Sequence, residues 1–157
     1  MKQDISENIN IIDNISFQLS DIQQQSLSLF HKDCSEENLW QVVIAFQDYP
    51  FRTATGLPFQ YKLKVGKRGG WNKELVIDRR ENSKTLAWSS IRLAFQNACK
   101  ITGEVKRPKA LGDIRGISYI YPMLWKFGVI EVPEKIREKM EEHHIFSLSF
   151  KTDFQFP

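Results

Sequence analysis

Two strand-like segments flank a glycine-rich turn near the middle of the chain. Residues 59–65 (FQYKLKV) alternate apolar and polar side chains, and residues 74–78 (ELVID) resume a strand pattern after the connection GKRGGWN. Alternation with a period of two is typical of a strand with one buried face, and a short glycine-rich connection favours a β-hairpin. We therefore predict a hairpin over about residues 59–78, whose solvent face carries Lys62 and Lys64 and is cationic.

The N-terminal part of the sequence has the pattern of an amphipathic helix. Large apolar side chains recur every seven residues in two series that are offset by three, within residues 1–34. This spacing places them along one face of a helix. That face can pair two protomers as a homodimer or pack on the protein's own core, and the sequence leaves both alternatives open. The candidate dimerisation residues are Ile5, Ile12, Ile15, Leu19, Ile22 and Leu29.

The chain after this helix is predicted to be a basic α+β domain, residues 35–157. Residues 39–46 (LWQVVIAF) are rich in β-branched and aromatic side chains and predict a strand. Proline and glycine interrupt residues 50–58, which predicts a loop or a broken edge strand. With the hairpin, these segments give a small antiparallel sheet. The expected fold class is therefore α+β, an N-terminal helix followed by the sheet and further helices.

The C-terminal half is expected to be mostly helical. An apolar stripe predicts a helix over about 84–100, capped by Asn82 or Ser83, and a helical turn with a second helix follows at about 109–127. A last helix and a tail occupy 133–157. Two helices joined by a turn beside a hairpin are the layout of winged-helix DNA-binding modules. We therefore predict a helix-turn-helix-like, winged-helix-like half.

The net charge of +3 hides a very uneven distribution of charged residues. Residues 1–51 hold 2 Lys and Arg against 8 Asp and Glu, and residues 116–157 hold 5 against 6. Residues 52–115 hold 15 Lys and Arg against 5 Asp and Glu, which is a net charge of +10. A block of this sign attracts anionic partners.

Nucleic acid is the partner that this basic segment favours, and DNA more than RNA. Clustered lysines and arginines bind phosphates with release of counterions, and a glycine-rich loop lets backbone N–H groups approach them. An aromatic residue in that loop, Trp71, can stack on a base or a sugar. The predicted nucleic-acid-binding residues are Lys62, Lys64, Lys67, Arg68, Trp71, Arg79, Arg80, Lys84, Lys106, Arg107, Lys109 and Arg115.

The sequence leaves three functions open. The first is a non-catalytic protein that binds double-stranded DNA in a regulatory or accessory role. The second is a small phage or mobile-element protein that inhibits or modulates a protein partner. The third is a metal-dependent nuclease, which Asp78 beside Arg79 and Arg80 leaves open, although the carboxylates Asp78, Glu81 and Asp113 are scattered among basic residues. We assign no catalytic residue, no metal and no cofactor.

The cysteines and the apolar runs bear on the cellular compartment. Cys34 and Cys99 are far apart and belong to no Cys-x-x-Cys pair, so we expect neither a zinc site nor a disulfide framework. Cys99 is expected to be a small buried side chain. No run approaches the ~18 apolar residues of a membrane span, and the N-terminus turns acidic before a signal-peptide core could form. We expect a cytoplasmic protein without a membrane segment.

Overall fold

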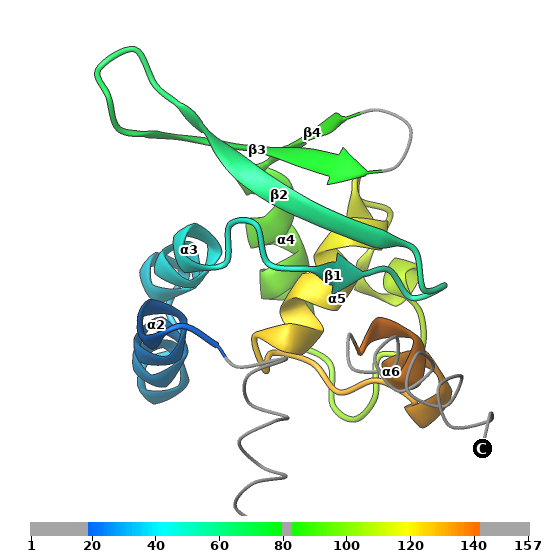
Figure 1. Ribbon diagram of the computed structural model, residues 1–157. Coiled ribbons are helices and arrows are strands. Elements are labelled where there is room, and N and C mark those ends of the chain that lie inside the picture. Colours follow the sequence, from blue (N-terminus) through cyan, green and yellow to red (C-terminus); the bar gives the residue numbers. More distant parts are fainter. Residues whose placement is uncertain (1–18, 80–82, 142–157) are drawn as a thin grey trace, which may run out of the picture.

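The computed structural model describes residues 19–79 and 83–141. In this part of the chain, a four-stranded antiparallel sheet lies over a layer of helices (Figure 1). The strands follow one another across the sheet in chain order: β1 (Phe51–Arg52), β2 (Pro58–Val65), β3 (Trp71–Arg79) and β4 (Lys84–Ala87). The predicted α+β class is confirmed.

The apolar side chains that alternate along the predicted hairpin form the buried face of the sheet. Tyr61 of β2 lies opposite Ile77 of β3, and Leu63 lies opposite Leu75. These four side chains are buried, as is Leu86 of β4, which pairs with Leu75. The hydroxyl of Tyr61 also donates a hydrogen bond to the Val43 carbonyl oxygen at 2.6 Å. One face of the sheet therefore packs on the helices.

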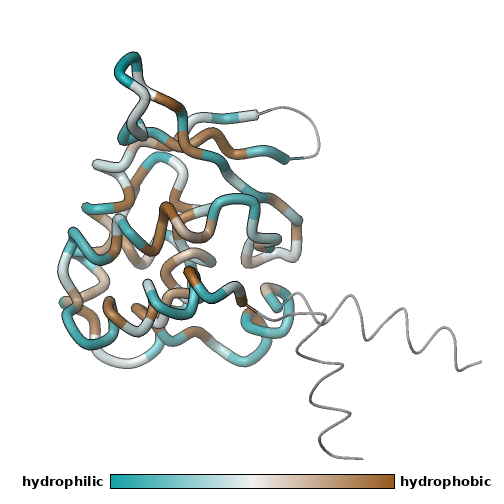
Figure 2. The backbone as a smooth tube through the Cα atoms, turned by 60° about the vertical axis from the view of Figure 1, so that its left-hand side comes forward, coloured by the Kyte–Doolittle hydropathy of each residue, from teal (hydrophilic) through white to brown (hydrophobic). Residues whose placement is uncertain are grey.

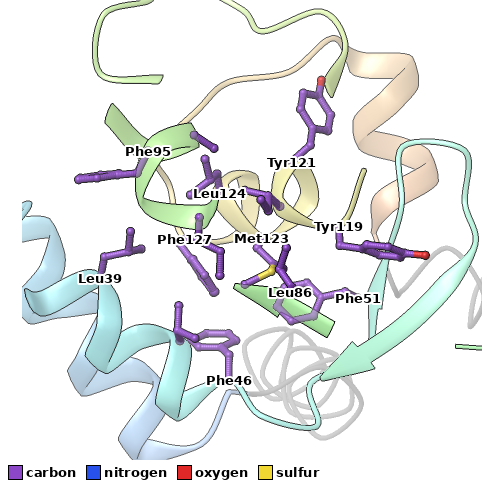
Figure 3. Packing of buried hydrophobic residues seen from close by; sticks show 14 of the residues in the cluster. Leu39, Phe46, Phe51, Leu86, Phe95, Tyr119, Tyr121, Met123, Leu124 and Phe127 are labelled. Atoms are coloured by element: carbon purple, nitrogen blue, oxygen red, sulfur yellow. The ribbon is translucent and has the colours of Figure 1, made fainter. Parts of the chain in front are cut away.

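Five α-helices and one 3₁₀ helix are present in the described residues. They are α2 (Asp21–Lys32), α3 (Glu36–Ala45), α4 (Trp88–Ala98), η1 (Pro108–Leu111), α5 (Ile117–Lys126) and α6 (Glu134–Met140). The central helix is α5, in which seven of the ten residues are buried. Figure 3 shows the core around it, where Phe127 at the end of α5 packs edge-on against Phe46 and Phe51, with ring centroids 5.1 and 6.1 Å apart.

Helix α2 begins at a capping box and packs on the core. The Ser20 hydroxyl accepts a hydrogen bond from the Gln23 N–H, and the Gln23 side chain accepts one from the Ser20 N–H. Phe30 is buried and its ring lies 5.9 Å from that of Phe95 in α4. His31 Nε2 is 2.9 Å from the carbonyl oxygen of Phe127, which ties α2 to the end of α5.

The predicted strand over residues 39–46 is wrong, because this segment belongs to helix α3 and its C-cap. Ser35 caps the helix by accepting a hydrogen bond from the Asn38 N–H. Leu39, Val42, Val43 and Phe46 are all buried, and their spacing is that of one helix face. The preference of β-branched residues for strands was overridden by this packing.

The predicted start of the helix over 84–100 is also wrong. Residues Lys84–Ala87 form strand β4, and α4 begins only at Trp88 without a side-chain cap. Ser83 precedes the strand rather than a helix, and Asn82 lies outside the described residues. The apolar stripe itself is confirmed, since Ile91, Ala94 and Phe95 are buried.

The winged-helix detail is not confirmed. Helix α5 is buried on most sides, so it presents no free face that could enter a DNA groove. Pro122 lies in the interior of α5, which starts at Ile117. Of the predicted segment 133–157, the structure describes residues 133–141, which contain α6, and the tail lies outside the described residues.

Candidate nucleic-acid interface

The hairpin of β2 and β3 extends beyond the helices as a two-stranded ribbon (Figure 1). Its base lies in the core through Leu63 and Leu75. Farther out, Val65 pairs with Trp71, and these side chains are 65% and 47% exposed. Figure 2 shows the hydrophilic turn of this ribbon projecting from a body that contains most of the hydrophobic chain. We call residues 64–74 the ribbon.

The turn of the ribbon is closed by glycines. The Gly66 N–H donates to the Gly70 carbonyl oxygen, and the Gly69 N–H donates to the Gly66 carbonyl oxygen at 3.0 Å. Gly69 has a φ of 88°, a conformation that favours glycine. Lys67 and Arg68 lie between these residues and are exposed. Two cations and an exposed indole, that of Trp71, therefore share the end of the ribbon.

Lys73 fixes the base of the ribbon to the helices, a role that the sequence reasoning missed. Its ammonium lies 3.8 Å from the centroid of the Trp40 ring in α3 and 5.5 Å from that of Trp88 in α4. The two rings pack edge to face at 5.0 Å. Desolvation in this position lowers the pKa of Lys73 from its ordinary value. The sequence signal for this contact was that Lys73 is two residues from Leu75, so that both side chains lie on the strand face that packs on the helices.

The two lysines of the outer sheet face have acidic neighbours. The Lys64 ammonium lies 2.7 Å from the Glu74 carboxylate, and the Lys62 ammonium lies 3.9 Å from Asp48. Both pairs are largely exposed, so each contributes little to stability and the lysines can still turn to a phosphate. The outer face is thus less positive than the expected cationic face.

Arg79 is held by the fold at the end of β3. Its guanidinium donates a hydrogen bond to the Tyr119 hydroxyl of α5 at 2.6 Å, and the arginine is only partly exposed. Lys84 is exposed in strand β4, and Arg115 is exposed beside this strand. Arg80, the remaining member of this predicted group, lies outside the described residues.

The other predicted cations lie elsewhere. Lys106 and Arg107 are exposed in the loop before η1, and Lys109 is exposed in η1 itself. Asn97 of α4 donates a hydrogen bond to the Leu111 carbonyl oxygen at 2.7 Å and so fixes this helical turn. In Figure 1 this segment and the turn of the ribbon lie on opposite sides of the molecule. The structure therefore divides the predicted residues among the ribbon, the β4 edge and the η1 loop.

The candidate dimerisation residues fall into two environments. Leu19 is partly buried and packs against the core. Ile22 and Leu29 point away from the core and are 68% and 58% exposed. Ile5, Ile12 and Ile15 lie outside the described residues.

The groups considered for metal or thiol chemistry are scattered. Within residues 19–79 and 83–141, no three His, Cys, Asp or Glu side chains gather where they could hold a metal ion. Asp78 and Asp113 are exposed, while Glu81 lies outside the described residues. Cys99 is exposed, so its expected burial is wrong, and Cys34 is an exposed free thiol as well. Desolvation, followed by the charges of Cys99 and Asp33, raises the pKa of Cys34.

Comparison with known proteins identifies no family for this chain. The chain matches no protein-family model, no curated protein and no solved structure. Among the described residues, the helices are too short or too polar to cross a membrane.

Proposed function

We propose that this protein binds double-stranded DNA in a non-catalytic, regulatory or accessory role, with the ribbon as its contact surface. The observation that supports this most is the projection of a basic two-stranded hairpin from the body of the molecule (Figure 1). Residues 64–74 contain four Lys and Arg against one Glu. The major groove of B-DNA admits a two-stranded β-ribbon, and clustered cations bind the phosphates at its rims.

The chemistry of the ribbon fits a position between the two phosphate backbones. Lys67 and Arg68 at the exposed turn can reach phosphates or base edges, and arginine binds guanine with paired hydrogen bonds. Trp71 supplies an apolar surface for a sugar or a thymine methyl group. Lys73 contacts the two tryptophans and so joins the base of the ribbon to helices α3 and α4. The buried helix α5 has no part in this proposal.

The test is binding of a labelled DNA duplex, followed by fluorescence anisotropy over a series of salt concentrations. Lys67→Gln combined with Arg68→Gln removes two exposed cations and should lower the slope of log K against log salt by about 2. The matched control is Lys106→Gln combined with Arg107→Gln, which removes the same charge from the η1 loop and should leave the affinity nearly unchanged. Absent binding at about 50 mM salt, or binding that salt does not weaken, would overturn the proposal.

A protein partner is the second candidate, and the pair Val65 and Trp71 favours it. Two large apolar side chains are exposed side by side at the end of the ribbon. Aromatic residues with exposed apolar neighbours are typical centres of protein interfaces. A stoichiometric protein complex that survives nuclease treatment and high salt, and that Trp71→Ala disrupts, would favour this function over DNA binding.

A further inference from the structure

A shallow hollow of about 410 Å³ opens beside the edge strand β4, apart from the turn of the ribbon. Four segments meet there: β2, β3, β4 with the residue before it, and the turn before α5. The residues that line it are Lys64, Val76, Ser83, Lys84, Thr85 and Arg115.

The fold positions Arg115 at this place. Gly116 follows it and packs so closely on β4 that a Cβ atom on this glycine would lie 2.4 Å from Leu86 Cδ1. The turn before α5 therefore abuts the strand that carries Lys84 and Thr85. Arg115 reaches the hollow from that turn, while Lys64 reaches it from the outer face of the sheet.

The charge in the hollow is unbalanced. Lys64 has the Glu74 carboxylate at 2.7 Å. Lys84 and Arg115 have no ion pair with a carboxylate in residues 19–79 and 83–141. Among the described residues, two positive charges therefore remain in the hollow, and the hydroxyls of Ser83 and Thr85 add hydrogen-bond donors beside them.

Phosphate is the anion that this set of groups suits. A guanidinium binds phosphate oxygens with paired hydrogen bonds, and lysine adds a point charge. An internal phosphodiester carries one negative charge, whereas a phosphomonoester carries nearly two at neutral pH. The monoester therefore matches the two unbalanced cations. Val76 offers an apolar contact for an attached sugar.

We propose that the hollow binds a phosphomonoester, and that its source is the terminal phosphate of a nucleic-acid strand. The proposal rests on the DNA binding proposed above, and it adds a preference for phosphorylated ends. Lys64 belongs both to the ribbon and to the hollow, so one duplex end can occupy the two neighbouring surfaces. A free nucleotide carries the same phosphate chemistry and is separated from a strand end by the test.

The test compares duplexes of one sequence that differ only in the terminal group. Duplexes with 5′-phosphate, 3′-phosphate or hydroxyl ends are titrated with the full chain, and one type of phosphorylated end should bind about tenfold more tightly than the hydroxyl end. Lys84→Gln and Arg115→Gln should each abolish this ratio. Lys106→Gln removes an exposed cation outside the hollow and should preserve it. Equal affinity for all three duplexes overturns the proposal.

A second arm distinguishes failure here from failure of DNA binding. Inorganic phosphate and adenosine 5′-monophosphate are added to the ¹⁵N-labelled chain, and amide shifts of Thr85 and Arg115 are followed by NMR. One outcome is that the ligands shift these amides, that Lys84→Gln removes the shifts, and that the chain binds no duplex. This result would support the phosphate site with a free nucleotide as its ligand, and it would overturn the DNA function. The other outcome is equal affinity for the three duplexes and no such amide shifts. This result would overturn the phosphate site and leave the proposed DNA binding standing. Melting temperatures of the variants confirm that each is folded.

Discussion

The ammonium of Lys73 lies 3.8 Å from the centroid of the Trp40 ring, and this contact joins strand β3 to helix α3. Trp40 and Trp88 are both nearly buried, so the lysine covers the edge of the core at the point where the ribbon leaves it. Four cations lie in residues 64–74. Lys73 contacts the two tryptophans and Lys64 pairs with Glu74, whereas Lys67 and Arg68 are exposed at the turn.

Replacing Lys73 should therefore affect stability more than DNA binding. Lys73→Met keeps an apolar stem over the rings and removes the charge, and a cation–π contact at an exposed site contributes about 0.5–1 kcal/mol. We expect a loss of that size in the free energy of unfolding, measured in urea. Lys67→Met at the exposed turn is the matched control and should change the free energy by less than about 0.5 kcal/mol. Equal effects of the two substitutions would contradict the role of Lys73.

Gly116 is constrained both by its backbone and by its neighbour. Its φ is 81°, and a Cβ atom would lie 2.4 Å from Leu86 Cδ1 in the core. Gly103 has nearly the same φ, 83°, with nothing within 4 Å of such an atom, so Gly103→Ala measures the backbone strain alone. We expect a loss of about 1 kcal/mol for Gly103→Ala. Gly116→Ala should lose about 1–3 kcal/mol more, because the core must shift. Similar losses in the free energy of unfolding for both variants would show that the Leu86 side chain can move aside without destabilising the core.

The sequence predicted the hairpin because all its local signals agree. Residues 59–65 alternate, the turn contains three glycines, and β2 and β3 pair as the pattern requires. Residues 39–46 carry two conflicting signals, a β-branched composition and an apolar spacing of i, i+3, i+4 and i+7. The helical spacing prevailed because Ser35 supplies a cap and the apolar face packs on the core. The capping box at Ser20 was likewise a readable signal for the start of α2.

The site could be predicted only in part, because sequence position does not decide where a cation lies. The turn of the ribbon was found from Lys67, Arg68 and the glycines around them. The division of the other cations follows from tertiary packing, which sends the η1 loop away from the ribbon (Figure 1). The apolar character of α5 on nearly all sides was the signal that it is a core helix and not a recognition helix.

Two buried tyrosines should make the protein unstable in alkali. Burial raises the pKa of Tyr121 to about 12 and that of Tyr61 well above its ordinary value. Each pKa is higher in the folded state, so the stabilisation is complete below pH about 10 and is lost as the pH rises toward 12. Absorbance of tyrosinate should show Tyr61 and Tyr121 ionising only as the protein unfolds. Ionisation of both before unfolding would contradict this.

Tyr121→Phe separates two contributions of that hydroxyl. The hydroxyl donates a hydrogen bond to the Val105 carbonyl oxygen at 2.5 Å, and its loss should cost about 1 kcal/mol at pH 7. The variant has one fewer group to ionise, so its stability should fall less steeply between pH 10 and 12 than that of the parent chain. Urea unfolding at several pH values measures both effects. Parallel curves for the two proteins would contradict the assignment.

Ile22 and Leu29 lie seven residues apart on the exposed face of α2, and this spacing predicts self-association through two copies of that helix. Light scattering at increasing protein concentration should show a monomer becoming a dimer. Ile22→Glu and Leu29→Glu should each hold the chain as a monomer without lowering its stability, because neither side chain packs in the core. Phe30→Ala is the contrasting variant, since that buried ring is needed for folding and its loss should cost about 3–5 kcal/mol. A monomer at every concentration would show that the exposed side chains of α2 do not pair protomers.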